Sequence, residues 1–151
     1  MKKNKIWLTL FILSLSLLLV VSGCGKTSSD DIGKTRVANN LEITLEDIKL
    51  KISNNDKKQM LQLDFDVKNV GKETAGAGAG DFVIQTKDGK KHRMYGLNAN
   101  NFGDEIPAGK ILKGPGFYDI PIDQKEVTVI YELYSQETTE NVKWTVTIPA
   151  K

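Results

Sequence analysis

The stretch LQLDFDVKNVGKE, residues 61–73, carries the clearest structural signal in the sequence. Apolar side chains alternate with polar ones through its first part, at Leu61, Leu63, Phe65 and Val67. Alternation with a period of two places the apolar side chains on one face of an extended strand and the polar ones on the other. The segment Asn69-Val70-Gly71 then ends the strand. The stretch therefore predicts a strand with one buried face and one solvated face.

The residues on the N-terminal side of this stretch alternate in the same way. Apolar side chains recur at every second position through residues 41–45, and the pattern resumes with a shifted phase through residues 48–52. The break in phase at Glu46-Asp47 predicts a β-bulge or a bend. The polar run Ser53-Asn54-Asn55-Asp56 predicts a turn into the next strand.

The C-terminal side predicts a hairpin and several further strands. Residues 82–84 run into Asp88-Gly89, a strong hairpin signal, and residues 90–95 form the returning strand. Residues 97–109 are expected to form a loop. More strands are predicted at residues 110–112, 116–122, 127–134 and 142–148. About eight short strands without a convincing helix predict an all-β fold, an antiparallel β-sandwich.

The segment at residues 74–81 is rich in glycine and alanine. Its Gly-x-Gly-x-Gly spacing suggests a phosphate-binding loop, but the Lys-Ser/Thr pair of such a loop is missing and no helix is expected to follow. We therefore expect a flexible or bulged connection between two strands.

Four phrases together carry a resemblance to a known family. They are LQLDFDVKNVGKE at residues 61–73, QTKDGKKH at 85–92, IPAGKILKGPGFYDIP at 106–121 and VTVIYEL at 127–133. The chain resembles, over residues 33–149, the telokin-like, immunoglobulin-like domain of unknown function found in secreted bacterial lipoproteins. The resemblance implies an immunoglobulin-like β-sandwich and implies no particular activity. Since the chain lacks the paired cysteines of antibody-type domains, packing alone has to hold the sandwich.

The first residues of the chain predict an export signal. Lys2, Lys3 and Lys5 precede an apolar run at residues 6–21, and the small residues Ser22 and Gly23 follow. A cationic segment, an apolar segment and small residues at the exit are typical of a signal peptide, here residues 1–23. A transmembrane anchor is the alternative, but the run is shorter than the ~20 residues that a membrane span needs.

The segment Val20-Val21-Ser22-Gly23-Cys24 resembles the lipobox of bacterial lipoproteins. The resemblance implies that the Cys24 thiol receives a diacylglycerol group and that cleavage falls between Gly23 and Cys24. Two acyl chains anchor a protein stably, whereas one gives only marginal binding. We expect a lipid-anchored protein on the outer face of the cytoplasmic membrane, with a flexible tether at residues 24–33 and the sandwich at residues 34–151.

Charge and cysteine content exclude several classes of protein. Three of the 21 basic residues lie in the first five positions and all 19 acidic residues follow Cys24, so the rest of the chain has a formal net charge of −1. Such a balance gives no electrostatic reason to bind nucleic acid. Cys24 is the only cysteine, which rules out an internal disulfide framework. We expect no cofactor and no metal.

A few clusters could carry chemistry, and each has a structural alternative. The run Lys90-Lys91-His92-Arg93 could bind anionic wall polymer or phospholipid headgroups, or could simply be a solvated strand whose lysines discourage edge pairing. Asp64 and Asp66 could flank a cation, as could the turn at residues 54–56, or both could be solvated polar groups. Four aromatic residues could line a ligand groove or fill the core: Tyr118, Tyr131, Tyr134 and Trp144.

The sequence therefore favours a non-enzymatic surface module that binds a protein or a cell-envelope ligand. An accessory or inhibitory lipoprotein that acts on an envelope enzyme is the alternative. A hydrolase that uses carboxylates such as Asp64, Asp66, Asp104 or Glu105 is a weaker hypothesis, because carboxylate pairs are common on solvated surfaces.

Overall fold

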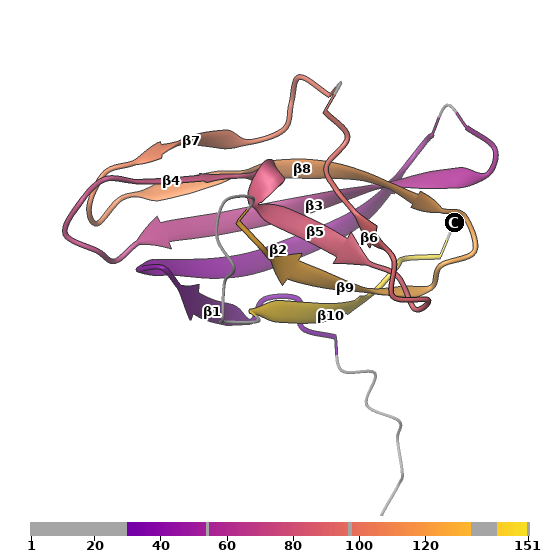
Figure 1. Ribbon diagram of the computed structural model, residues 1–151, viewed down its shortest axis with the longest axis horizontal. Helices are drawn as coiled ribbons and strands as arrows, with labels where there is room; N and C mark the ends of the chain where they lie inside the picture. The colour runs from indigo at the N-terminus through magenta and orange to yellow at the C-terminus, as the bar shows by residue number, and fades with distance from the viewer. Residues whose placement is uncertain (1–29, 54, 97, 134–141, 151) are drawn as a thin grey trace, which may run out of the picture.

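The protein folds as two facing antiparallel β-sheets with a small third sheet at one end (Figure 1). The computed structural model describes residues 30–53, 55–96, 98–133 and 142–150. The predicted signal peptide, Cys24 and most of the predicted tether lie outside the described residues. The predicted β-sandwich is confirmed.

The first sheet has four strands in the order β1-β2-β3-β8. Their bounds are β1 (Thr35–Ala38), β2 (Leu41–Lys51), β3 (Lys58–Asn69) and β8 (Ile111–Pro121). The central strand β3 contains the alternating stretch, and it pairs along nearly its whole length with both β2 and β8.

The second sheet has the order β10-β9-β5-β6, and a two-stranded sheet joins β4 to β7. The bounds are β4 (Ala75–Gly78), β5 (Phe82–Gln85), β6 (Lys91–His92), β7 (Gly103–Ile106), β9 (Glu126–Tyr131) and β10 (Lys143–Thr147), with a 3-10 helix η1 (Ala79–Asp81).

The core lies between the two four-stranded sheets and follows the predicted alternation. Leu61, Leu63, Phe65 and Val67 are all buried. Phe65 stacks on Phe82 of the opposite sheet with ring centroids 4.2 Å apart, so aromatic contacts join the two layers. Among the described residues, the buried cluster and its partly buried neighbours all fall between Ile32 and Ile148.

Two local predictions are confirmed. The register between β2 and β3 shifts between Leu45 and Asp47, so the phase break in the sequence is a β-bulge. The Asp88-Gly89 turn joins β5 to β6, with Ile84 opposite His92. The returning strand is shorter than the predicted residues 90–95, because Met94 leaves the second sheet and bridges to Tyr118 of the first.

The prediction of a flexible or bulged connection at residues 74–81 is wrong, because a strand and a 3-10 helix occupy residues 75–81. These residues form β4 and η1, and Ala77 and Ala79 are buried. A Cβ atom on Gly78 would lie 3.1 Å from the Cα atom of Gly103, so the small residues allow β4 and β7 to approach closely. Strand β7 accordingly occupies part of the predicted loop at residues 97–109.

Two more differences concern strands. Residues 111–121 form one strand, not the two predicted around Gly114-Pro115-Gly116. A proline is tolerated there because β8 is the last strand of its sheet, and the Pro115 carbonyl accepts a hydrogen bond from the Phe102 N–H at 2.8 Å. Strand β1 was not predicted, although Asn39 and Asn40, both with positive φ (50° and 61°), form the tight turn between β1 and β2.

Candidate functional site

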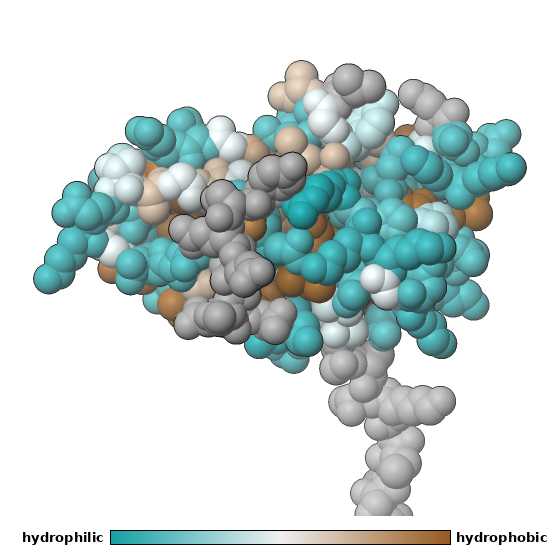
Figure 2. Space-filling view, in the orientation of Figure 1, coloured by the Kyte–Doolittle hydropathy of each residue, from teal (hydrophilic) through white to brown (hydrophobic). Residues whose placement is uncertain are grey.

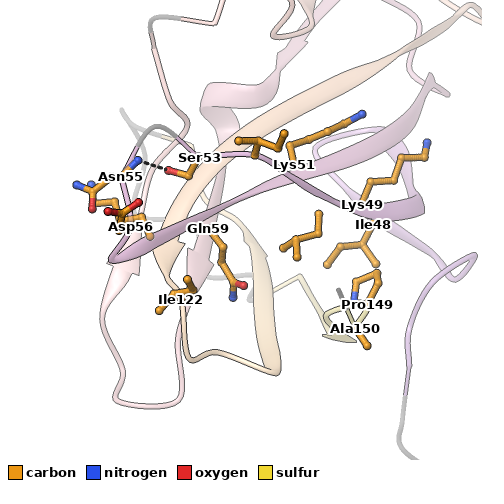
Figure 3. Close-up of a pocket in the computed structure, with 13 residues that line it drawn as sticks. Ile48, Lys49, Lys51, Ser53, Asn55, Asp56, Gln59, Ile122, Pro149 and Ala150 are labelled. Atoms are coloured by element: carbon orange, nitrogen blue, oxygen red, sulfur yellow. Dashed lines mark hydrogen bonds between the residues drawn. The ribbon is translucent and has the colours of Figure 1, made fainter.

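A groove of about 770 Å³ opens at the end of the sandwich where β2 runs toward the turn before β3 (Figure 3). One wall is the continuous stretch at residues 48–53. Pro149 and Ala150, which follow β10, form the other wall, and Ile122 and Gln59 also contact the space. The two sheets thus contribute opposite sides of the groove.

The groove exists because the apolar pattern of β2 continues past the end of the core. The apolar side chains become less covered along this stretch: in β2, Leu45 is 0% exposed and Ile48 is 6% exposed, whereas Ile52, just after the end of β2, is 94% exposed. Leu50 is only partly buried between them. Ile122, on the same groove, is 43% exposed. The part of the chain that the structure describes leaves the last part of this apolar stretch uncovered.

Lysines contribute the charge along the groove, where Lys49, Lys51 and Lys58 are opposed by one acidic residue, Asp56. Lys49 forms ion pairs with Asp64 and, at 3.1 Å, with Asp47. The hydrogen bond to Asp64 is the main cause that raises the pKa of Lys49. No ion pair between described residues involves Lys51.

The face shown in Figure 2 is mostly hydrophilic, and hydrophobic atoms are visible only in separate patches between the polar side chains.

The outer face of the first sheet carries ion pairs in which Lys113 contacts Asp66 at 2.5 Å and Lys68 contacts Glu42 at 3.5 Å. Lysines thus neutralise the carboxylates of this face, which is typical of a solvated surface.

The run Lys90-Lys91-His92-Arg93 lies at the tip and edge of the second sheet. Lys91 and Arg93 both form ion pairs with Glu132, and the hydrogen bond from Lys91 is the main cause that lowers the pKa of that carboxyl. Lys90 lies 2.9 Å from Asp88. Carboxylates of the domain itself therefore neutralise much of the positive charge that the sequence suggested for binding an anionic ligand.

His92 faces inward from the same run. Its Nε2 atom lies 3.4 Å from the Thr86 hydroxyl, and burial lowers the pKa of its imidazole. This contact places the only histidine of the chain beside a buried threonine, away from the carboxylates that the hydrolase hypothesis invokes.

The carboxylates of the hydrolase hypothesis are dispersed. Asp64 is engaged by Lys49 and Gln62; burial works to raise the pKa of this carboxyl, but the two hydrogen bonds outweigh burial and lower it. Asp104 and Glu105 are exposed on β7, in a different sheet. Among the described residues, no group of three or more His, Cys, Asp or Glu side chains is placed to hold a metal ion.

The turn at residues 54–56 is partly described. The Asn55 side chain accepts a hydrogen bond from the Lys57 N–H at 2.9 Å, which is an Asx turn. Asn54 lies outside the described residues.

The aromatic residues fill the core. Tyr118 and Trp144 are fully buried, and Tyr131 is 2% exposed. The Tyr118 hydroxyl donates to the Ala79 carbonyl at 2.9 Å, and the Trp144 Nε1–H donates to the Lys34 carbonyl at 2.7 Å. Tyr134 lies outside the described residues. The side chains of Tyr118, Tyr131 and Trp144 therefore pack the core of the sandwich and do not line a groove.

Sequence reasoning missed the role of Asp31, which it placed in the tether. The Asp31 carboxylate accepts hydrogen bonds from Lys34 at 2.6 Å, from Arg36 at 3.1 Å and from the Thr145 N–H at 3.0 Å. The hydrogen bond from Lys34 is the main cause that lowers the pKa of Asp31. Asp31, three residues before the predicted boundary, is thus already part of the folded domain. Two adjacent Asp residues in a polar run give no sequence signal that the second of them is held by these hydrogen bonds.

The family model described as "Domain of unknown function (DUF4352)" matches residues 30–141. A search of curated protein sequences gives no match. The described residues include no helix long and apolar enough to cross a membrane.

Several solved structures have a similar fold. A "putative lipoprotein" of Bacillus subtilis has a TM-score of 0.60 at 18% identity, covering 75% of this chain and only 38% of that longer one. The YjhA protein of B. subtilis has a TM-score of 0.53 at 18% identity, covering 78% of this chain and 98% of its own. An uncharacterized β-sandwich protein of Clostridium difficile 630 has a TM-score of 0.50 at 15% identity, covering 78% and 91%. At these identities the likeness supports the β-sandwich fold and nothing finer.

Proposed function

This chain belongs to the DUF4352 family, a domain of unknown function, and we propose that it is a lipid-anchored binding module on the outer face of the cytoplasmic membrane. Residues 20–24 support the anchor, because they join an aliphatic pair, two small residues and a cysteine at the end of an apolar run. The telokin-like resemblance is in keeping with this role.

The uncovered groove is the observation that supports binding. An apolar stripe that ends in a 94%-exposed isoleucine is unfavourable in water unless another surface covers it. The described residues that line the groove are lysines, apolar side chains and a few polar ones, and no hydrogen bond among them joins a nucleophile to a base, so binding explains the groove better than catalysis does.

Lipid attachment is tested with the full chain in a bacterium that processes lipoproteins. The wild-type chain should incorporate labelled palmitate and remain with the membrane fraction. Cys24→Ala should lose the label and either accumulate uncut or be released, while the tether variant Ser28→Ala should behave as wild type. A cleaved Cys24→Ala protein that stays on the membrane would contradict the anchor.

Binding is tested separately by crosslinking on intact cells, with wild-type protein compared with an Ile52→Ser variant. A partner captured by the wild type and lost from the variant supports a binding module. If that partner is an envelope enzyme whose rate changes on capture, the accessory or inhibitory role is favoured. Equal capture by both proteins would remove the groove from the proposal.

A further inference from the structure

The chain enters the domain on the side of the sandwich where β1 and β10 lie next to each other (Figure 1). At the outer edge of β10, hydrogen bonds of 2.9 and 3.0 Å join Asp31 to Thr145 in both directions. Asp31 comes seven positions after Cys24, and seven extended residues span at most about 25 Å. A lipid on Cys24 would therefore keep this side of the domain within that distance of the headgroups.

A hollow of about 680 Å³ lies on the same side. Part of its lining is β1, and part is the outer face of the second sheet, where Thr145, Thr128 and Gln85 follow one another across β10, β9 and β5. The hydroxyl and amide groups of this row can donate hydrogen bonds. Arg36 and Lys143 bring positive charge to the hollow. These groups together suit an oxyanion such as phosphate.

The described lining of the hollow carries more positive than negative charge. Asp31 is the one acidic residue in it, and that carboxylate is shared by Lys34 at 2.6 Å, by Arg36 at 3.1 Å and by a backbone N–H. Lys143 is exposed, and no ion pair between described residues involves it. With Asp30 included, β1, β10 and the described residues before β1 hold three cations and two anions. Lys143 therefore carries the unbalanced charge.

Arg36 is held in one orientation beside the hollow. Its Cζ atom lies 5.7 Å from the ring centroid of Trp144, and its Nη2 donates a hydrogen bond to Asp31. Its buried Nε has no hydrogen-bond partner among the described residues. Guanidinium groups bind phosphate through several N–H donors in one plane. Arg36 therefore retains donors that the contacts of the fold leave unused.

The rim of the hollow and the position of Cys24 favour a bilayer as the source of the oxyanion. Val37 is 59% exposed on the rim, and the carboxylate opposite it, Glu42, is paired with Lys68 at 3.5 Å. An exposed apolar side chain among basic ones is typical of a surface that meets the boundary between headgroups and acyl chains. Linkage through Cys24 also holds headgroups near the hollow at an effective concentration on the order of millimolar. A soluble anion has no such advantage.

We propose that the β1–β10 side of the domain docks on a bilayer of anionic phospholipid, with a headgroup phosphate bound between Arg36 and Lys143. Thr128 and Thr145 offer hydroxyl groups to the same phosphate, and Val37 faces the acyl boundary. The docking rests on the lipid anchor of the proposed function and orients the domain on the membrane. The groove at residues 48–53 shares no lining residue with this hollow, so it stays open to a partner.

The test couples the chain from residue 24 to vesicles through its single thiol, Cys24, with a maleimide phospholipid. This chain includes every residue of the buried cluster. Trp144 is its only tryptophan and lies beside Arg36, so quenching of its fluorescence by spin-labelled headgroups measures docking. Quenching should be strong in equimolar phosphatidylcholine and phosphatidylglycerol and weak in phosphatidylcholine alone.

Two neutralising substitutions decide whether the hollow is responsible. Lys143→Gln should shift the equilibrium toward undocked protein about fivefold, the scale of one basic residue at an anionic bilayer. Lys51→Gln removes the same charge from an exposed lysine of the groove and should leave docking unchanged. Equal shifts in the two variants would show attraction by net charge alone and would overturn the site.

Two other results would overturn the membrane as the occupant. One is weak quenching in both kinds of vesicle. The other is a shift of the Lys143 amide signal with soluble glycerol phosphate but not with vesicles, which would assign the hollow to a soluble anion. Chemical coupling replaces cellular lipid attachment in this experiment, so neither result would alter palmitate labelling of Cys24. Loss of that labelling in cells would contradict the anchor and leave the measured docking as it is.

Discussion

Asp31 is joined to Thr145 by a pair of hydrogen bonds that fastens the start of the domain to the middle of β10. The Asp31 N–H donates to the Thr145 carbonyl at 2.9 Å, and the Thr145 N–H donates to Asp31 Oδ2 at 3.0 Å. If lipid on Cys24 holds the protein, any pull from the membrane enters the sandwich at this contact.

Removing the Asp31 side chain should therefore destabilise the whole sandwich. Asp31→Ala loses the acceptor of the Thr145 N–H and of two cationic side chains, and we expect a cost of about 1–2 kcal/mol in the free energy of unfolding. Urea unfolding of the mature chain with Cys24→Ser measures it. Asp30→Ala, one residue earlier, is the control and should change stability by less than about 0.5 kcal/mol. Equal effects of the two substitutions would show that the hydrogen bonds of the Asp31 carboxylate are dispensable for stability.

The pH dependence of stability should carry two opposite contributions. The pKa of Asp31 is lowered, chiefly by its hydrogen bond to Lys34, so its contribution is present above the unfolded value of 3.8 and is lost as the pH falls through the folded pKa. The pKa of Asp81 is raised by burial, so its contribution is present below 3.8 and is lost as the pH rises through the folded pKa.

Asp81→Asn tests the second contribution. Asn Oδ1 can still accept the hydrogen bond from the Gly78 N–H, which measures 2.8 Å with Asp81. We expect the variant to be at least as stable as wild type at pH 7 and to lose its relative advantage as the pH falls below the folded pKa of Asp81. Thermal unfolding across pH 3 to 7 measures it. A larger advantage for the variant at the acidic end would contradict the raised pKa.

Gly114 should be the least replaceable glycine of β8. A Cβ atom there would lie 2.3 Å from the Cβ atom of Phe102, which packs against the core ring of Phe65. Gly114→Ala should cost about 2–3 kcal/mol, in the range for overpacked sites. Gly76→Ala is the matched control, because nothing lies within 4 Å of the position of its Cβ atom. Chemical denaturation measures the free energy of unfolding of both variants, and an equal loss in the two would contradict the prediction.

The fold could be predicted from the sequence where one chain segment carried its own signal. Alternation located β2, β3 and β9, and the shifted phase located the bulge, because each is a property of consecutive side chains. The pairing of β4 with β7 could not be predicted this way. It depends on Gly78 meeting Gly103 across 25 positions of sequence, and a run of Gly and Ala has no alternation to reveal a strand.

The site was harder to predict for a related reason. The alternation that identified residues 48–52 as a strand treats Ile48, Leu50 and Ile52 as equivalent. Which of them is buried depends on how far the second sheet extends, and that is set by where β10 ends, about a hundred positions away. The charged run at residues 90–93 was visible in the sequence, whereas its carboxylate partner Glu132 came from a distant strand end.

The boundary of the core within β2 gives the last prediction. Ile48 lies within β2 and Ile52 directly follows its last residue, Lys51; the two have the same side chain, but Ile48 is 6% exposed and Ile52 is 94% exposed. Ile48→Ala should cost about 2–4 kcal/mol of unfolding free energy, since it removes buried methyl groups and leaves a cavity. Ile52→Ala should change stability by less than about 0.5 kcal/mol, because its side chain contacts mainly water. If Ile52→Ala were as costly as Ile48→Ala, the groove would be closed in solution and Ile52 would be a core residue.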